Sequence, residues 1–275
     1  MPTYADSFGL QWAAFRATQY DSRLGEPRSA ERLWRTTKWK PEDLAGRTVL
    51  EAGCGAGRFT EVLLGAGARV IAFDMSEAAR VARDQNVGKG PLSIFRGDIL
   101  RPALPARRFE YVFCHGVVQH TPDPAGAIAA LFELVAPGGR LSVDVYPKLD
   151  FPSPWSTPKY FWRRWTTKLR PETLLKIVRA YIPIWLPIDT AIRHIPYVGN
   201  RILAELRVPC WNYLDLPWRE RLEWAILDTF DALSPAYDLP MSAAELRAAC
   251  ALPGAVEVDV FPGGNGFVAN LRREA

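Results

Sequence analysis

Short apolar runs recur through the middle of the chain and alternate with segments whose apolar residues have helical spacing. Apolar runs of this length are typical of buried parallel strands. Strand–helix–strand alternation requires crossover connections, so we expect these strands to lie parallel in one sheet. The expected strands are Thr48–Leu50, Arg69–Phe73, Leu92–Phe95, Phe109–Cys114 and Leu141–Tyr146, and helices are expected at Arg58–Leu64 and Asp123–Val135.

Two further strands are predicted near the end of the sequence. Val256–Phe261 and Gly266–Arg272 flank the turn Pro262–Asn265, a pattern that predicts an antiparallel hairpin. The helix expected before them, Ser242–Ala251, begins with Ser and Glu at capping-box spacing. The fold class predicted is therefore α/β, with a seven-stranded, mostly parallel sheet that ends in an antiparallel hairpin and has helices on both faces.

The segments outside this core predict two more parts. Phe8, Trp12 and Phe15 recur at helical spacing, which gives a helix with an aromatic face. That face either packs on the sheet or closes over a ligand, and we expect residues 1–46 to form a helical lid. Residues 47–150 and 241–275 form the predicted core, and residues 151–240 are an insertion between strands five and six that we expect to cap the substrate site.

The insertion has an unusual composition. It holds seven of the ten tryptophans and eleven of the 23 prolines, and this proline density predicts short helices and turns. From 155 to 210 it carries ten Lys or Arg against three acids. Basic stretches that carry tryptophan fit an anionic substrate or a membrane surface, while the alternative is a solvated basic face over an aromatic core.

The composition limits the classes of protein to which the chain can belong. The chain has 275 residues, 48% of them hydrophobic, and a net charge of +4 that does not predict a nucleic-acid partner. Its four cysteines lack metal-site spacing and predict reduced thiols in a cytoplasmic protein. We expect no signal peptide, and no run approaches the roughly 18 uninterrupted apolar residues that a membrane span needs.

The strongest chemical signal is the stretch from Glu51 to Gly57, Glu-Ala-Gly-Cys-Gly-Ala-Gly. Glycines at a strand-to-helix turn let the backbone approach a ligand and direct N–H groups at negative charge. Arg58 stands where a dinucleotide fingerprint needs a third small residue, and the Gly-Lys-Ser/Thr of a P-loop is missing. Asp74 follows the second strand about 20 residues after the first glycine, a spacing that suits a ribose diol.

This stretch resembles the first motif of the class I S-adenosylmethionine (SAM)-dependent methyltransferases, which have a Rossmann-like fold. The resemblance extends to Asp98 after the third strand, to the Cys114–Pro124 loop after the fourth, and to a Pro137–Gly139 turn before the fifth. That loop resembles the small-molecule, ubiquinone-biosynthesis type, and the resemblance implies SAM as cofactor with S-adenosylhomocysteine as product. The cofactor residues it implies are Glu51, Gly53, Cys54, Gly55, Gly57, Arg58, Asp74, Met75, Asp98, Ile99, Cys114 and Gln119.

Methyl transfer to a protonated nucleophile needs a base near the ends of strands four and five. His120 is the first candidate because imidazole titrates near neutral pH. Tyr146 is the second and His115 the third, although a histidine after a strand can equally serve to bond the backbone. No Asp, Glu and His cluster has metal-site spacing, so we expect no metal.

The N-terminal segment from Phe8 to Ser22 and the stretch Glu223–Asp231 of the insertion resemble a bacterial methyltransferase subgroup of biosynthetic pathways, which implies substrate contacts from Gln11, Tyr20, Trp211 and Asp228. The function implied is methylation of a small-molecule acceptor, foremost at an oxygen of a sugar, lipid-linked or natural-product substrate. Nitrogen or carbon methylation, nucleic-acid methylation and SAM binding without catalysis stay open as alternatives. The expected partner is a small-molecule acceptor, anionic or lipid-linked, and no nucleic-acid partner is expected. Peripheral contact with a membrane and a homodimer are both compatible with the sequence.

Overall fold

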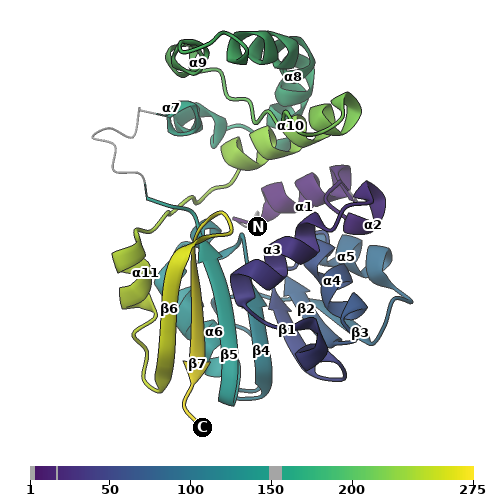
Figure 1. Cartoon of the computed structure of the whole chain (residues 1–275), viewed down its shortest axis with the longest axis vertical. Coiled ribbons are helices and arrows are strands. Elements are labelled where there is room, and N and C mark those ends of the chain that lie inside the picture. The colour runs from purple at the N-terminus through teal and green to yellow at the C-terminus, as the bar shows by residue number, and fades with distance from the viewer. Residues whose placement is uncertain (1–3, 17, 149–156) are drawn as a thin grey trace. The chain divides into compact units, whose positions relative to one another are not determined.

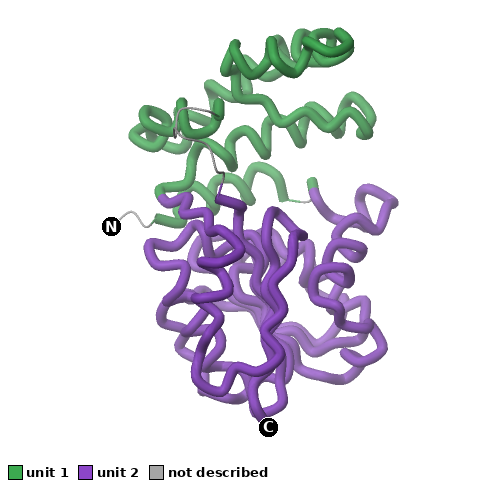
Figure 2. The backbone as a smooth tube through the Cα atoms, turned by 60° about the vertical axis from the view of Figure 1, so that its left-hand side comes forward, with its two compact units in different colours: residues 1–18, 150–236 green, residues 19–149, 237–275 purple. Residues whose placement is uncertain are grey.

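The computed structural model describes residues 4–16, 18–148 and 157–275. The chain divides into two compact units (Figure 2). Unit 1 combines residues 1–18 with 150–236, and unit 2 combines residues 19–149 with 237–275. The predicted lid segment 1–46 is therefore divided between the units after residue 18, and the predicted boundary at 150/151 and Trp155 lie outside the described residues.

Unit 2 contains a seven-stranded sheet in the order β3-β2-β1-β4-β5-β7-β6 (Figure 1). The first five strands are parallel, while β7 pairs antiparallel with both β5 and β6. The strand order reverses between β1 and β4, the place where sheets of this kind bind ligands. The predicted fold class is confirmed. The strands are β1 (Thr48–Ala52), β2 (Arg69–Asp74), β3 (Leu92–Arg96), β4 (Phe109–Cys114), β5 (Val135–Val145), β6 (Ala255–Gly263) and β7 (Gly266–Arg273).

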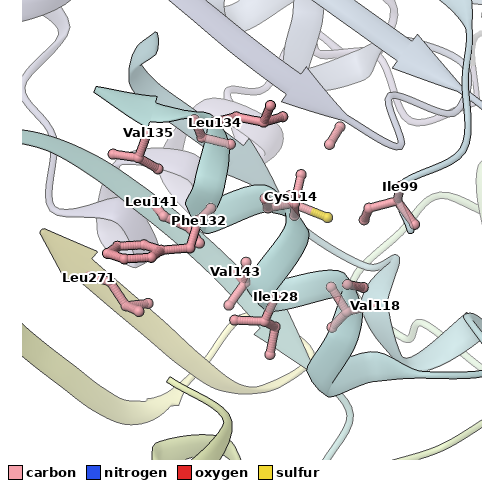
Figure 3. Close-up of a cluster of buried hydrophobic side chains, with 14 of the residues drawn as sticks. Ile99, Cys114, Val118, Ile128, Phe132, Leu134, Val135, Leu141, Val143 and Leu271 are labelled. Atoms are coloured by element: carbon pink, nitrogen blue, oxygen red, sulfur yellow. The ribbon is translucent and has the colours of Figure 1, made fainter. Parts of the chain in front are cut away.

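Alternate residues of the central strands face two separate apolar cores. Leu50 and Val112 face one core with α6 (Pro124–Leu134) and α11 (Ala243–Ala249), part of which is drawn in Figure 3. Val49 faces the other core, which includes residues of α3, α4 and α5. The helices of unit 2 are α2 (Asp21–Leu24), α3 (Arg28–Thr37), α4 (Arg58–Gly65), α5 (Ala78–Asn86), α6 and α11, with short 3₁₀ turns η1 (Pro41–Leu44) and η2 (Val118–His120).

One local prediction in the core is wrong. The Pro137–Gly139 turn expected before strand five lies inside β5, which begins at Val135. Phe109 pairs with Val135 and Tyr111 with Arg140, so the extra residues of β5 form a bulge. A Cβ on Gly139 would come within 3.0 Å of backbone carbonyl oxygens, so this bulge needs glycine there.

Unit 1 is helical. Its buried core joins Phe15 to apolar residues of α8 and α10, so the aromatic face of α1 packs on helices of the insertion. The prediction that prolines break the insertion into short helices is wrong for α8, which runs unbroken over Pro183 and Pro187. The helices of unit 1 are α1 (Asp6–Ala14), α7 (Pro158–Thr166), α8 (Pro171–Arg193), α9 (Gly199–Leu206) and α10 (Trp218–Leu233).

Candidate active site

Three acids stand where neighbouring parallel strands of unit 2 end. Glu51 is the penultimate residue of β1, Asp74 ends β2, and Asp98 follows β3 by two residues. Because β3, β2 and β1 are adjacent and parallel, these side chains belong to the same edge of the sheet. The structure thus brings together the acids that the sequence placed at one site.

The glycine loop joins β1 to α4 at this edge. Gly53, Gly55 and Gly57 all have positive φ (72°, 53° and 91°), a conformation that side chains with a Cβ rarely adopt. The N–H groups of Gly53 and Cys54 donate to the carbonyl of Phe73, which fastens the loop to the end of β2. Gly57 is the N-cap of α4, so this helix directs its N-terminus at the site.

The carboxylate of Asp74 is held by three donors. Its Oδ2 accepts from the Gly55 N–H at 3.0 Å, and its Oδ1 accepts from the N–H and hydroxyl of Ser76 at 2.9 and 2.7 Å. Burial nevertheless raises the pKa of Asp74 above its ordinary value, against the effect of these donors. A carboxylate has about four acceptor positions, so one remains for a ligand hydroxyl or amine.

Glu51 is more deeply buried. Its Oε2 accepts a hydrogen bond of 2.5 Å from Thr60 on α4. Burial, with a smaller contribution from the charge of Asp74, raises its pKa to about 8 against the opposing effects of the Thr60 hydrogen bond and the positive charge of Arg58. A buried acid of this kind favours a cationic ligand group beside it, because a positive charge stabilises the ionised form.

Tyr20 and Asn86 form hydrogen bonds with the backbone of the glycine loop. The hydroxyl of Tyr20 donates to the carbonyl of Ala56 at 2.5 Å and accepts from Asn86 at 2.8 Å. The same Asn86 amide donates to the carbonyl of Gly57 at 3.1 Å. Tyr20 was predicted to contact substrate; its buried hydroxyl is engaged in holding the loop.

The other predicted cofactor residues lie around the same edge. Asp98 Oδ1 accepts from the Leu100 N–H at 2.9 Å, and the neighbouring Ile99 is buried. The carbonyl of Met75 accepts from the guanidinium of Arg96, and the guanidinium of Arg58 lies 4.5 Å from the centre of the Phe59 ring.

Two predicted cofactor residues are cysteines. Cys54 and Cys114 are buried, and burial raises the pKa of both thiols well above its ordinary value, so neither thiol is a nucleophile. All four cysteines of the chain are free, and the cytoplasmic location expected from them stays a prediction.

Gln119 has the clearest signature of a ligand-binding position. It is fully buried in η2, after β4, and within the described residues neither its amide oxygen nor its amide nitrogen has a hydrogen-bond partner. Buried amides are nearly always bonded, so this one favours a polar ligand group at the end of β4. Together with three acids and the glycine-loop amides, it gives a donor and acceptor set that fits a nucleoside and amino-acid ligand.

His120 lies next to Gln119 and is also buried. Its Nδ1 lies 3.1 Å from the carbonyl oxygen of Tyr237, so the neutral ring carries its proton on Nδ1 and its lone pair on Nε2. The ring meets that of Tyr146 edge to face, with 5.3 Å between the ring centres. The structure therefore brings together the first and second candidates for the base.

His115, the third candidate, belongs to a buried network instead. Its Nε2 lies 3.0 Å from the Ser142 hydroxyl and its Nδ1 lies 3.7 Å from Asp144, and burial lowers its pKa to about 4. Arg32 pairs with the same carboxylate at 2.8 Å, and the Gly116 N–H also donates to it. Burial alone would raise the pKa of Asp144, but His115, Arg32 and Gly116 hold it below its ordinary value.

The roles of Asp144 and Arg32 in this network were not predicted from the sequence. Asp144 had a usable signal, an acid near the end of an apolar strand, the same pattern that singled out Glu51. Arg32 and Asn86 had none, because each lies on a polar helix and reaches its partner only through the fold. Among the described residues, no group of three His, Cys, Asp or Glu side chains is placed to hold a metal ion.

Three predicted substrate residues lie in unit 1. Gln11 is buried and donates to Asp231 at 2.9 Å, and Asp228 accepts from the hydroxyl of Tyr213. Trp211 lines a pocket of about 420 Å³, together with Asp189 and other residues of unit 1. This volume is within the usual range of small-molecule sites.

Both polar and apolar residues line the pocket. Arg193 pairs with Asp189 on its wall, and Asn212 donates to the same carboxylate at 2.8 Å. Burial raises the pKa of Cys210, also on the wall, to about 12, so its thiol stays protonated. The remaining lining residues are Thr157, Pro158, Lys159, Asn200, Leu203, Ala204, Val208 and Pro209.

Comparison with known proteins identifies relatives of the sheet-containing part of the chain. A family described as a methyltransferase domain matches residues 50–143, from β1 to β5. The ubiquinone biosynthesis O-methyltransferase of Azotobacter vinelandii is 40% identical over 102 residues, and that of Pseudomonas paraeruginosa is 38% identical over 102 residues. Each match covers 36% of this chain and 44% of the relative, so the chain spans less than half the length of these relatives.

A solved structure extends the likeness in fold. A chain of a Haloferax volcanii complex that contains the Trm112 methyltransferase activator is similar over 98% of this chain and 99% of its own length. The TM-score is 0.52 and the sequence identity is 16%, a level that supports a common fold.

Proposed function

We propose that this chain, which carries a class I SAM-dependent methyltransferase domain, transfers a methyl group to an oxygen of a small-molecule acceptor. The observation that carries the proposal is the glycine loop bound to Asp74 beside two further strand-end acids, Glu51 and Asp98. When bound, SAM supplies a methyl group on a positively charged sulfur.

Each part of the site has a role toward that cofactor in this proposal. Asp74 accepts from a ribose hydroxyl through its remaining acceptor position, and Asp98 accepts from the adenine amine. Glu51 provides negative charge for the cationic portion, and Gln119 donates and accepts through its buried amide. Tyr20 and Asn86 hold the loop in its ligand-binding conformation.

The base for an acceptor hydroxyl is His120 in this proposal. Tyr237 fixes the proton on Nδ1, so Nε2 takes the proton of the acceptor as its oxygen bonds to the methyl group. Tyr146 supports the ring by its edge-to-face contact and can bond the acceptor through its hydroxyl. His115 has no part in this step, because its Nε2 faces Ser142 in a buried network.

Oxygen is preferred as the target because the similar curated proteins are named O-methyltransferases. Their acceptor is not carried over, since the match covers less than half of their length. We further propose that unit 1 contributes acceptor-binding residues. The pocket beside Trp211 supports this, because an indole ring and apolar side chains next to polar groups suit an amphipathic molecule.

The test is acceptor-dependent turnover. The protein is incubated with SAM and panels of hydroxylated, amino and carbon-acid acceptors, including phenols, sugars and lipid-linked compounds, and S-adenosylhomocysteine is measured by mass spectrometry. We expect product only with hydroxylated acceptors. Product with amines or carbon acids alone would replace the oxygen assignment, and SAM binding without turnover across all panels would favour a non-catalytic role.

A further inference from the structure

The last three turns of α8 lack, on their outward side, the polar residues that a helix normally exposes to water. Between Ala180 and Ala191 the exposed positions are all apolar. They include Ile184, with 70% of its surface exposed, and Ile188. The six exposed residues of these three turns are Ala180, Pro183, Ile184, Pro187, Ile188 and Ala191.

The opposite side of the same helix is already used. Leu174, Val178, Ile182 and Leu186 recur every four residues and are buried in the core of unit 1. A helix that is apolar on both sides is normally covered on both. The exposed isoleucines of α8 fall on one stripe, because Ile177, Ile184 and Ile188 are seven and four residues apart.

The apolar surface continues onto α9 and α7. Ile202 and Leu206 on α9 and Val198 at its N-cap are exposed at a spacing of four residues, and α9 packs against α8. The indole N–H of Trp162 on α7 donates to the carbonyl of Arg207 at the end of α9 at 2.6 Å. Eleven of the seventeen large apolar residues exposed in the described part of the chain lie between residues 162 and 206.

The segment that carries this apolar surface is also strongly cationic. The segment 159–207 carries ten Lys or Arg against three acids, a net charge of +7. One of the three acids, Asp189, is buried and paired with Arg193. Arg164 lies 5.1 Å from the centre of the Trp165 ring and Arg207 lies 5.3 Å from that of Phe161, so the exposed tryptophans occur beside positive charge.

We propose that unit 1 docks on an anionic phospholipid surface through the exposed apolar residues of α7, α8 and α9. Isoleucine ridges enter the acyl boundary while tryptophan, lysine and arginine meet the headgroups, as in interfacial helices. Among the described residues no helix is both long and apolar enough to cross a bilayer. A second copy of the chain fits less well, because it would bring two surfaces of strong positive charge together.

The test is vesicle binding by the full chain, and it does not depend on the proposed methyl transfer. Flotation is measured with phosphatidylglycerol–phosphatidylcholine vesicles and with phosphatidylcholine alone. Ile184→Glu is compared with Val87→Glu, a matched control at an exposed valine of unit 2 that is 73% exposed. We expect binding to the anionic vesicles only, weakened about tenfold by Ile184→Glu and by high salt, and unchanged by Val87→Glu.

Three results would overturn this proposal. The first is an absence of binding to anionic vesicles, and the second is equal binding by Ile184→Glu and Val87→Glu. The third is a wild-type protein that is a dimer by molar mass in lipid-free solution and an Ile184→Glu variant that is a monomer. That result would show that the surface serves self-association. Thermal unfolding of both variants identifies any loss of binding that comes from misfolding, and Lys176→Glu then tests the same surface through its charge.

Discussion

The carboxylate of Asp74 accepts a hydrogen bond from the backbone N–H of Gly55 at 3.0 Å, and this contact ties the second acid of the site to the glycine loop. The residue proposed to bind ribose therefore also sets the shape of the loop proposed to bind the rest of the cofactor. Removing this carboxylate changes both functions at once.

Asp74→Ala should weaken SAM binding by about 2–3 kcal/mol, because ligand hydroxyls lose a charged acceptor and the Gly55 N–H loses its partner. The measurement is isothermal titration calorimetry with SAM and with S-adenosylhomocysteine. Asp84→Ala, at an exposed acid on α5, is the matched control and should leave both affinities unchanged. Equal affinities for wild type and Asp74→Ala would remove Asp74 from the cofactor site.

SAM affinity should rise with pH through the titration of Glu51. The pKa of this buried acid is raised to about 8, so at pH 6 to 7 the free protein holds it protonated. A cationic ligand favours the ionised form, so binding releases a proton and the affinity rises by up to about tenfold per pH unit below pH 8. Calorimetry in buffers of different ionisation enthalpy measures the proton released.

Glu51→Gln is the control for this effect, since it retains the shape and an acceptor for Thr60 but does not titrate. The pH dependence should disappear in this variant. The folding stability of the free protein depends on the same group. Because the pKa of Glu51 is raised, the folded state binds its proton more tightly than the unfolded state does. The stability contributed by protonated Glu51 is therefore complete below pH 4.5 and lost as pH rises through about 8. A pH-independent SAM affinity in the wild type would contradict the assignment.

A residue of this site could be predicted from the sequence only where the pattern that marks it lies within a few positions of it. The glycine turn and the acids at 51, 74 and 98 follow from apolar runs and from residues within a few positions of them. The link between Arg32 and Asp144 spans 112 positions and depends on how α3 packs on the sheet, which no local pattern gives.

The unbroken course of α8 was missed for a related reason. Proline removes one hydrogen bond from a helix, which locally predicts a break. Pro183 and Pro187 instead occupy the exposed side, while Ile182 and Leu186 beside them are buried in the core of unit 1. Burial of those two residues stabilises the helix across both prolines, and this gain arises only from tertiary packing.

Tyr20→Phe should destabilise the glycine loop without changing acceptor recognition. The variant leaves the Ala56 carbonyl and the Asn86 amide each with one partner fewer, at a cost of about 1–2 kcal/mol. Differential scanning calorimetry should show a Tm lower by roughly 2–8 °C. Tyr197→Phe, at a fully exposed tyrosine, is the control and should not change the Tm. An unchanged Tm together with a raised KM for the acceptor would restore the substrate contact predicted from the sequence.

His120→Ala should lower turnover by about 10²–10⁴-fold while leaving SAM affinity unchanged, because the side chain is assigned to the acceptor proton and not to the cofactor. The pH–rate profile separates this role from a structural one: the wild type should lose activity as an imidazole becomes protonated, and the variant should not show that limb. His194→Ala, at an exposed histidine of unit 1, is the matched control. If His120→Ala turns over normally and Tyr146→Phe does not, the base is Tyr146; if both turn over normally, the acceptor reacts without a base from this pair of rings.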